Sequence, residues 1–180
     1  YTYHNAKNAE TFGIELDVKK SLDFIGLRGL SLVCNAAYIH SRVRFEEGAP
    51  ERDRPLAGQS PYLVNAGLFY QHDDKGISAS LLYNRIGKRI ESVGVPMQNQ
   101  NEDIPDIYEM PRNSLDLTFS KKIGKVVEIK AGIQDMLNSK IEYKQFVKLA
   151  DENGGKRERE QLVRSYRPGV DINVGVSLKF

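Results

Sequence analysis

Residues 170–180 alternate strictly between apolar and polar side chains. The intervening positions carry Asp, Asn, Gly, Ser and Lys, and the apolar positions are Val170, Ile172, Val174, Val176, Leu178 and Phe180. Successive side chains of an extended strand point to opposite faces of a sheet, so this stretch predicts a strand with one purely apolar face. Such a face needs a cover, either a second layer of protein or lipid.

The same alternation recurs in six earlier segments of the chain. They cover residues 12–18, 30–45, 62–70, 77–83, 114–120 and 127–133, and the last of them runs on irregularly to residue 146. Each has an apolar face opposite a face of polar, small or charged residues. The pattern predicts an all-β fold, in which about seven strands pair in sequence order as an antiparallel up-and-down meander. No helix is expected in residues 62–83 or 114–133.

The connections between these strands alternate in length. Short ones are expected at residues 23–29, 72–76 and 122–125, and long polar ones at 46–60, 91–112 and 147–164. Outer-membrane barrels have short periplasmic turns and longer extracellular loops, whereas a soluble sandwich has no reason to sort its connections in this way. With the C-terminus in the periplasm, the tight turns lie there and the long loops outside.

Aromatic residues mark the ends of the predicted strands. Tyr62 and Tyr70 lie eight residues apart on one apolar face, a span of about 26 Å along an extended strand. At the usual tilt this approaches the apolar band of about 25 Å, which aromatic girdles border. Phe119 and Phe180 would mark the periplasmic girdle, and the outer girdle would hold Phe12, Tyr38 and Tyr83.

Composition excludes several classes of protein. The 180 residues carry a net charge of only +2, which gives no sign of a nucleic-acid partner. No run approaches the roughly 20 apolar residues of a membrane-spanning helix. The mean hydropathy of −0.48 does not argue against membrane strands, because their apolar residues occupy only every second position. Cys34 is the single cysteine, so the chain holds no internal disulfide or Cys-based metal site.

Residues 133–143, I-Q-D-M-L-N-S-K-I-E-Y, resemble the N-L-F-[DN]-K-x-Y segment in the penultimate strand of TonB-dependent outer-membrane receptors. Asp135 stands in place of Asn, Met136 and Leu137 replace Leu-Phe, and Ser139 is an additional residue. Further stretches are similar to the strand opening, a loop-to-strand segment and the terminal strand of the same family. These are residues 11–16, 56–65 and 166–180, and residues 58–62 are similar to receptors of the Bacteroides group.

The resemblance implies a barrel of about 22 strands with a plugged lumen, in the bacterial outer membrane. Residues 1–180 would form its C-terminal third, without the plug domain and the earlier strands. Seven strands cannot close such a barrel, because single-chain barrels have even strand numbers and lipid does not tolerate open edges. Tyr1 opens directly into polar sequence without a signal peptide, so the chain is expected to be part of a longer one.

Function and partners also follow from the resemblance. The chain would be barrel wall of an active importer for a scarce large ligand, such as a metal chelate, a glycan or a peptide. Expected partners are outer-membrane lipid, the barrel-insertion machinery, the remaining strands, the plug domain, and the energy-transducing TonB partner through the missing N-terminal part. The insertion signal would comprise Val176, Leu178 and Phe180.

Candidate functional residues fall into two sets. The first is expected to face the lumen, where it forms a hydrated wall or contacts the plug, and it comprises Glu15, Asp17, Lys19, Asn65, Glu128 and Lys130. The second lies at the outer end of the fourth strand, where it is either solvated surface or holds anions such as lipopolysaccharide phosphates. It comprises Arg85, Lys88 and Arg89.

No catalytic constellation is visible. His4, His40 and His72 are far apart in the strand pattern and lack a Ser or Cys partner at a matching depth. The chain is therefore expected to be no enzyme and to hold neither cofactor nor metal. Two alternatives to the importer stay open: a soluble β-barrel that holds an apolar ligand, and another outer-membrane barrel such as a passive porin or a membrane enzyme.

Overall fold

The computed structural model describes residues 5–49, 51–96, 103–150 and 156–178. This part of the chain forms eleven β-strands and one short 3-10 helix, η1 (Asp23–Ile25). Within it, no helix is long and apolar enough to cross a membrane. The strands are β1 (Asn8–Ser21), β2 (Leu30–Arg44), β3 (Tyr62–His72), β4 (Ile77–Ile86), β5 (Arg89–Ser92), β6 (Ile107–Glu109), β7 (Arg112–Ile123), β8 (Val127–Gln134), β9 (Ile141–Ala150), β10 (Lys156–Tyr166) and β11 (Asp171–Leu178).

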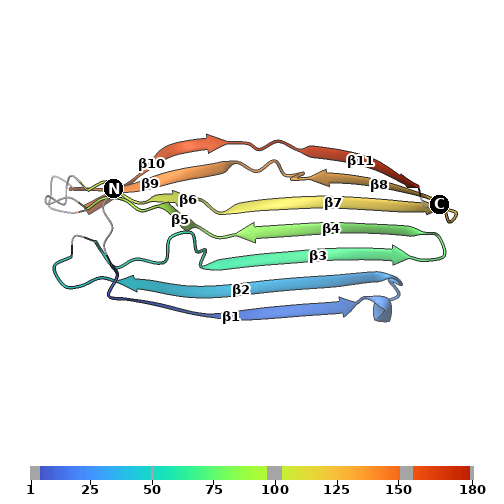
Figure 1. Cartoon of the computed structure of the whole chain (residues 1–180), viewed down its shortest axis with the longest axis horizontal. Helices are drawn as coiled ribbons and strands as arrows, with labels where there is room; N and C mark the ends of the chain where they lie inside the picture. The colour runs from blue at the N-terminus through green and yellow to red at the C-terminus, as the bar shows by residue number, and fades with distance from the viewer. Residues whose placement is uncertain (1–4, 50, 97–102, 151–155, 179–180) are drawn as a thin grey trace.

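The larger of two sheets has seven strands in the order β1-β2-β3-β4-β7-β8-β11, and every neighbouring pair is antiparallel. Figure 1 shows this meander from β1 along one edge to β11 along the other. The seven strands are those that the alternating segments predict, and they pair in sequence order. The predicted all-β, antiparallel up-and-down meander is confirmed.

The strand register places the apolar residues of the predicted alternation on one face of this sheet in all seven strands. One row of directly opposed side chains crosses six strands and consists of Leu32, Leu68, Leu81, Leu117, Ile133 and Ile172. We call this side the apolar face and the other side the polar face. Because side chains alternate along every strand, one register keeps the two faces separate over the whole sheet.

The apolar face is uncovered. Among the described residues, the buried hydrophobic ones are only Val43, Ile90 and Tyr143. On the edge strands, Ile14 is 77% exposed and Val174 is 72% exposed. A folded sheet of this size ordinarily buries one face, so the surroundings must cover this one.

A second sheet, which we call the distal sheet, continues four of the seven strands. Its order is β10-β9-β6-β5, which repeats the order of β11, β8, β7 and β4 (Figure 1). The long connections expected at residues 91–112 and 147–164 are therefore wrong in part. They contain β6, most of β10 and parts of β5 and β9, in which apolar and polar residues do not alternate along the whole strand.

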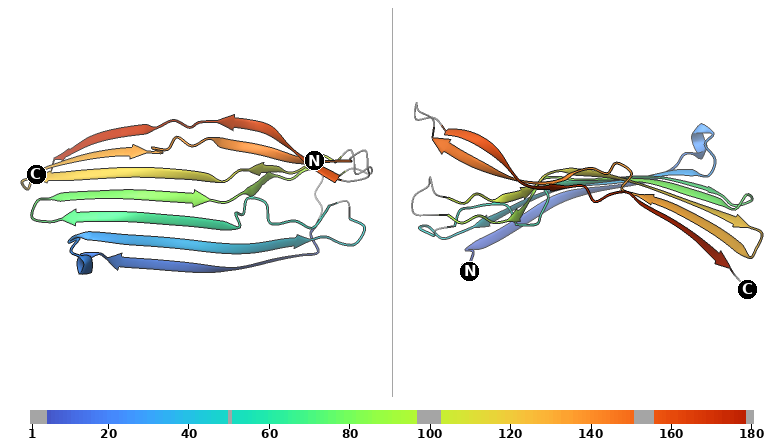
Figure 2. Two further views of the ribbon diagram at one scale, coloured as in Figure 1. Left: turned by 180° about the vertical axis from the view of Figure 1, so that it is seen from behind. Right: turned by 90° about the horizontal axis from the view of Figure 1, so that it is seen from above.

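The junction between the sheets interrupts each of the four strands. Pro111 and Pro168 lie in two of the interruptions and have no N–H to donate to a ladder. The third, between β8 and β9, contains Asp135 and Asn138 with φ values of 52° and 43°. This is the segment that resembles the receptor motif. Figure 2 shows β9 and β10 curving away from the plane of the larger sheet beyond this junction.

The loop that connects β2 to β3 lies beside the distal sheet. β3 begins only at Tyr62, and the preceding loop lies between β2 and β5. The Val43 amide donates to the Arg54 carbonyl at 2.8 Å, and the Gly58 amide donates to the Ile90 carbonyl at 2.7 Å. The loop thus joins the C-terminal end of β2 to the distal sheet through backbone hydrogen bonds.

Candidate functional site on the polar face

A chain of amide hydrogen bonds crosses four strands of the polar face. Asn35 donates from Nδ2 to Glu15 Oε1 at 2.6 Å and to Asp17 Oδ1 at 2.7 Å. Asn65 donates from Nδ2 to Asn35 Oδ1 at 3.4 Å. Asn84 in turn donates from Nδ2 to Asn65 Oδ1. All the donors point the same way, so the chain leads from a neutral amide in β4 to two carboxylates on the edge strand β1.

The register explains why these side chains meet. Asp17 lies opposite Asn35, Asn35 opposite Asn65, and Asn65 opposite Asn84. Opposed side chains on neighbouring strands lie about 5 Å apart, within reach of a short amide. The same face carries hydroxyl pairs nearer the turn between β3 and β4. Their oxygens lie 2.6 Å apart in Ser80–Thr118 and 2.8 Å apart in Ser78–Ser120.

An aromatic ring lies between the amide chain and the hydroxyl pairs. A Cβ built on Gly67 would stand 2.7 Å from Cε2 of Phe69 and 2.9 Å from Cδ2 of Leu82, so both side chains lie close above the glycine. Phe69 is 39% exposed and Leu82 is 38% exposed. Gly67 is needed here because any side chain would displace the ring. The polar face therefore holds a small apolar area bordered by amides and hydroxyls.

The residues predicted to face the lumen all lie on the polar face. Two carboxylates, Glu15 and Asp17, meet Asn35 in the amide chain, which also contains Asn65. Lys19 is the next residue on the same face of β1. Glu128 and Lys130 lie far from this cluster, in β8, and their charged atoms are 3.5 Å apart. The assignment of this face to a lumen stays a prediction.

Two of the predicted rim cations donate hydrogen bonds to side chains of neighbouring strands. Arg85 donates from Nη1 to Asn113 Oδ1 at 2.8 Å. Arg89 donates from Nε and Nη2 to Glu109 Oε2 at 2.9 and 2.8 Å. Arg89 is therefore an ion-pair partner within the distal sheet. Binding of an external anion by these residues stays a prediction.

The third rim cation, Lys88, contacts two aromatic rings. Its Nζ is 4.5 Å from the ring centroids of both Tyr108 and Phe146, and the two rings are themselves in edge contact at 5.6 Å. Burial is the main reason why the pKa of Tyr108 is raised, and the neighbouring Asp106 carboxylate adds to it. Lys88, directly before β5, thus links this part of the chain to β6 and β9 by cation–π contacts.

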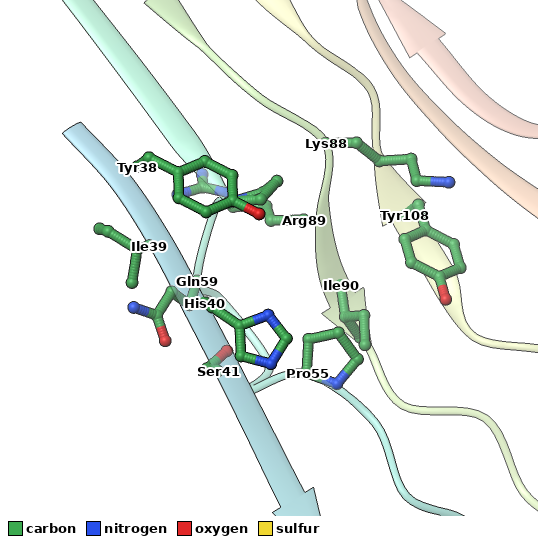
Figure 3. A pocket seen from close by; sticks show the side chains of 11 residues that line it. Tyr38, Ile39, His40, Ser41, Pro55, Gln59, Lys88, Arg89, Ile90 and Tyr108 are labelled. Atoms are coloured by element: carbon green, nitrogen blue, oxygen red, sulfur yellow. The ribbon is translucent and has the colours of Figure 1, made fainter. Parts of the chain in front are cut away.

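A hollow of about 210 Å³ separates β2 from the distal sheet. Tyr38 and His40 of β2 point toward the side where Pro55 and Ile90 lie (Figure 3). The further lining residues are Ile39, Ser41, Gln59, Pro61, Lys88, Arg89 and Tyr108. His40 also stacks on Phe12, with 5.0 Å between the ring centroids.

The histidines do not assemble a site in the described structure. His4 lies outside the described residues. His72 accepts a hydrogen bond at Nδ1 from the Lys75 amide at 3.4 Å and belongs to the β3–β4 turn, far along the sheet from His40. Among the described residues, no group of three or more His, Cys, Asp or Glu side chains is placed to hold a metal ion.

The residues of the predicted insertion signal lie at the end of β11. Val176 and Leu178 are 64% and 57% exposed on the apolar face. Phe180 lies outside the described residues. The structure therefore gives the position of two of the three side chains and does not bear on their recognition.

Two members of the amide chain are not among the predicted site residues. The alternation of β2 and β4 places Asn35 and Asn84 opposite the apolar residues, but it does not say which neighbours they meet. Their alignment with Asn65 depends on the register of three strands. A row of Asn residues at polar-face positions of successive strands is the signal that points to them.

Comparison with known proteins gives one distant similarity. No family model matches the chain, and no solved structure matches it. Transferrin-binding protein A of Haemophilus influenzae is 26% identical over 152 residues. The match covers 77% of this chain but only 16% of the length of that relative. It supports a loose link to outer-membrane receptors.

Proposed function

We propose that this chain is part of the wall of an outer-membrane β-barrel receptor that imports a scarce large ligand in a TonB-dependent way. The observation that carries the proposal is an apolar face that continues across seven antiparallel strands, opposite a face that carries most of their polar and charged residues. An apolar face that the chain itself leaves uncovered suits lipid, and a polar face with hydrated charges suits the interior of a large barrel.

The edges of the sheet support a larger barrel. β1 and β11 each have one neighbour in the larger sheet, and an unpaired strand edge in lipid leaves backbone groups without hydrogen bonds. In our proposal, the remaining strands of the receptor pair with these edges, a plug domain lies against the polar face, and the barrel-insertion machinery assembles the whole. The chain itself contributes wall and ligand contacts and performs no catalysis.

The ligand belongs to the same proposal. The relative is named for binding transferrin, and the sequence motifs resemble receptors that take up scarce ligands. We take a metal chelate, a glycan or a peptide as the cargo classes. Import would require the energy-transducing partner, so uptake by cells that carry the receptor should stop when that partner is deleted, while surface binding of the ligand persists.

Neighbouring residues on β7 test the membrane placement directly. Leu117 lies on the apolar face and Thr118 on the polar face. We would place a single cysteine at each, in a Cys34→Ala background, spin-label the native protein in lipid vesicles, and measure accessibility to oxygen and to a water-soluble nickel complex. The label at 117 should favour oxygen, and the label at 118 should favour nickel. Equal access to nickel at both sites would contradict lipid contact on the apolar face.

A further inference from the structure

The turn between β1 and β2 presents large apolar side chains to its surroundings. Phe24 is 70% exposed, and Ile25 and Leu27 are also exposed. The two other turns at this end of the larger sheet join β3 to β4 and β7 to β8, and between them they carry one large apolar residue, Val126. Apolar side chains gathered on an exposed surface mark an interaction site, so the β1–β2 turn is expected to have a partner that the other turns lack.

Hydrogen bonds hold this turn in one conformation. The Gly26 amide donates to the Asp23 carbonyl at 3.0 Å in η1, and the Gly29 amide donates to Asp23 Oδ1 at 2.9 Å. The Gln71 amide of β3 donates to the Gly29 carbonyl at 2.8 Å, which joins the turn to the sheet. Figure 2 shows the turn projecting out of the plane of the sheet. A structured turn thus displays the apolar side chains, and their exposure is a property of the fold.

The contact between Lys20 and Phe24 shows on which side of the sheet the turn lies. Lys20 is opposite Leu32, which belongs to the apolar face, and its Nζ lies 5.4 Å from the ring centroid of Phe24. The ring therefore lies on the side of the apolar face, where the exposed Leu16 and Val18 precede it on β1. A plug domain against the polar face would not cover this ring, whereas lipid on the apolar face would reach it.

The charges around the turn are mainly positive. The turn and the residues next to it contain Lys19, Lys20 and Arg28 against one acidic residue, Asp23. Lys19 belongs to the polar face, so Lys20 and the exposed Arg28 are the cations beside the apolar side chains. β3 contains no Lys, Arg, Asp or Glu, and β2 has its charged residues only at its far end. Cations next to apolar side chains at a membrane border attract anionic headgroups.

We propose that the turn between β1 and β2 is an anchor in the periplasmic leaflet of the outer membrane, where it binds anionic phospholipids. The apolar side chains enter the headgroup region, and the two cations bind lipid phosphates. They are Phe24, Ile25 and Leu27, and Lys20 and Arg28. The inference rests on the proposed function for the membrane, and it deepens that function by naming the lipid class and the residues that hold it. Such an anchor fixes the depth of this part of the wall, because displacement in one direction would bury the cations in hydrocarbon and in the other would expose the apolar side chains to water.

Spin labels test the depth of the turn. We would label Ile25→Cys in the Cys34→Ala background of the native receptor, in vesicles of phosphatidylcholine and phosphatidylglycerol, and measure access of oxygen and of the nickel complex. The label at 25 should favour oxygen, and the matched control Asp74→Cys, in the polar turn between β3 and β4, should favour nickel. Preference for nickel at 25, or low access of both reagents because protein covers the turn, would overturn the proposal. The label at 117 reports separately whether the wall contacts lipid at all.

Quenching by labelled lipids tests the lipid class. A fluorescent label on the cysteine at 25 would be quenched by phosphatidylglycerol or phosphatidylcholine that carries a nitroxide near the top of an acyl chain, each as a small fraction of phosphatidylcholine vesicles. Quenching by the anionic lipid should be stronger by at least about twofold. Lys20→Gln should bring this ratio closer to one, and the control Lys75→Gln, in a turn where Asp73 and Asp74 outnumber the lysine, should leave it unchanged. Equal quenching by the two lipids, or an equal change in the control, would overturn the assignment to anionic phospholipids.

Discussion

Phe69 lies over Gly67, so closely that a Cβ at position 67 would stand 2.7 Å from the ring. We therefore expect Gly67→Ala to force the ring away and to destabilise the protein by about 1–3 kcal/mol, as overpacking does. Urea unfolding of the protein in detergent measures this. The control is Gly175→Ala on the same face, where a Cβ meets no atom within 4 Å. Equal stability of the two variants would show that the ring has room to move.

Asn35 donates to two carboxylates at once, so a negative charge at this position should destabilise the protein. Asn35→Asp would place a third carboxylate beside Glu15 and Asp17 and remove the shared donor. We expect the variant to be destabilised by about 1 kcal/mol at low ionic strength, and to recover part of this loss in high salt, because salt screens the repulsion between exposed charges. Thermal unfolding at low and high salt measures the effect. Asn35→Ser, which adds no charge, should show no such recovery.

The ion pair between Arg112 and Asp135 fastens the junction of the two sheets. Its charged atoms are 2.5 Å apart, and the side chains are only 24% and 14% exposed. Asp135→Asn keeps a residue that tolerates the positive φ but removes the charge. We expect it to cost about 2 kcal/mol, somewhat less than loss of a fully buried pair.

An exposed ion pair is the control for this prediction. Arg44 and Glu10 are 44% and 50% exposed, and Glu10→Gln should cost less than about 1 kcal/mol. Denaturant unfolding of both variants gives the comparison. Similar losses in the two would mean that burial adds little to the pair at the junction.

Acid should loosen the turn between β1 and β2. The Ser21 hydroxyl and the Gly29 amide donate to the two oxygens of Asp23 and lower its pKa below the ordinary 3.8. A lowered pKa means that the bonds stabilise the turn fully above pH 3.8 and are lost as the pH falls below it, through the folded pKa. Hydrogen exchange at the Gly29 amide should accelerate there relative to neighbouring amides. Asp23→Asn should abolish this pH dependence.

The sequence predicts the larger sheet well, and the physical reason is that one of its two faces is apolar along its whole length. Wherever one face is apolar along its whole length, period-two alternation is visible and determines which residues share a side. The distal sheet lacks this signal. β10 reads K-R-E-R-E-Q-L-V-R-S-Y, with charged residues at successive positions, and Lys and Glu have low preference for strands. Its pairing with β9 depends on the neighbouring strand and not on its own pattern.

The candidate site is predictable only in part for a related reason. Alternation places Asn35, Asn65 and Asn84 on the polar side, but the amide chain requires that three strands align to the residue. The register is determined by the turns between them. A shift of two residues in one strand would keep every face unchanged and break the chain of hydrogen bonds.

The pairing of strands only with their sequence neighbours in the larger sheet has an evolutionary consequence. A hairpin of two strands can be duplicated or deleted without reversing the direction of any other strand, because the strands on either side of it are already antiparallel to each other. Loss of β3 and β4, for example, would leave β2 and β7 running in opposite directions and able to pair. Walls of this construction can therefore change their circumference in steps of one hairpin, and descendants of one ancestor can differ in size while each remaining strand keeps its own two faces.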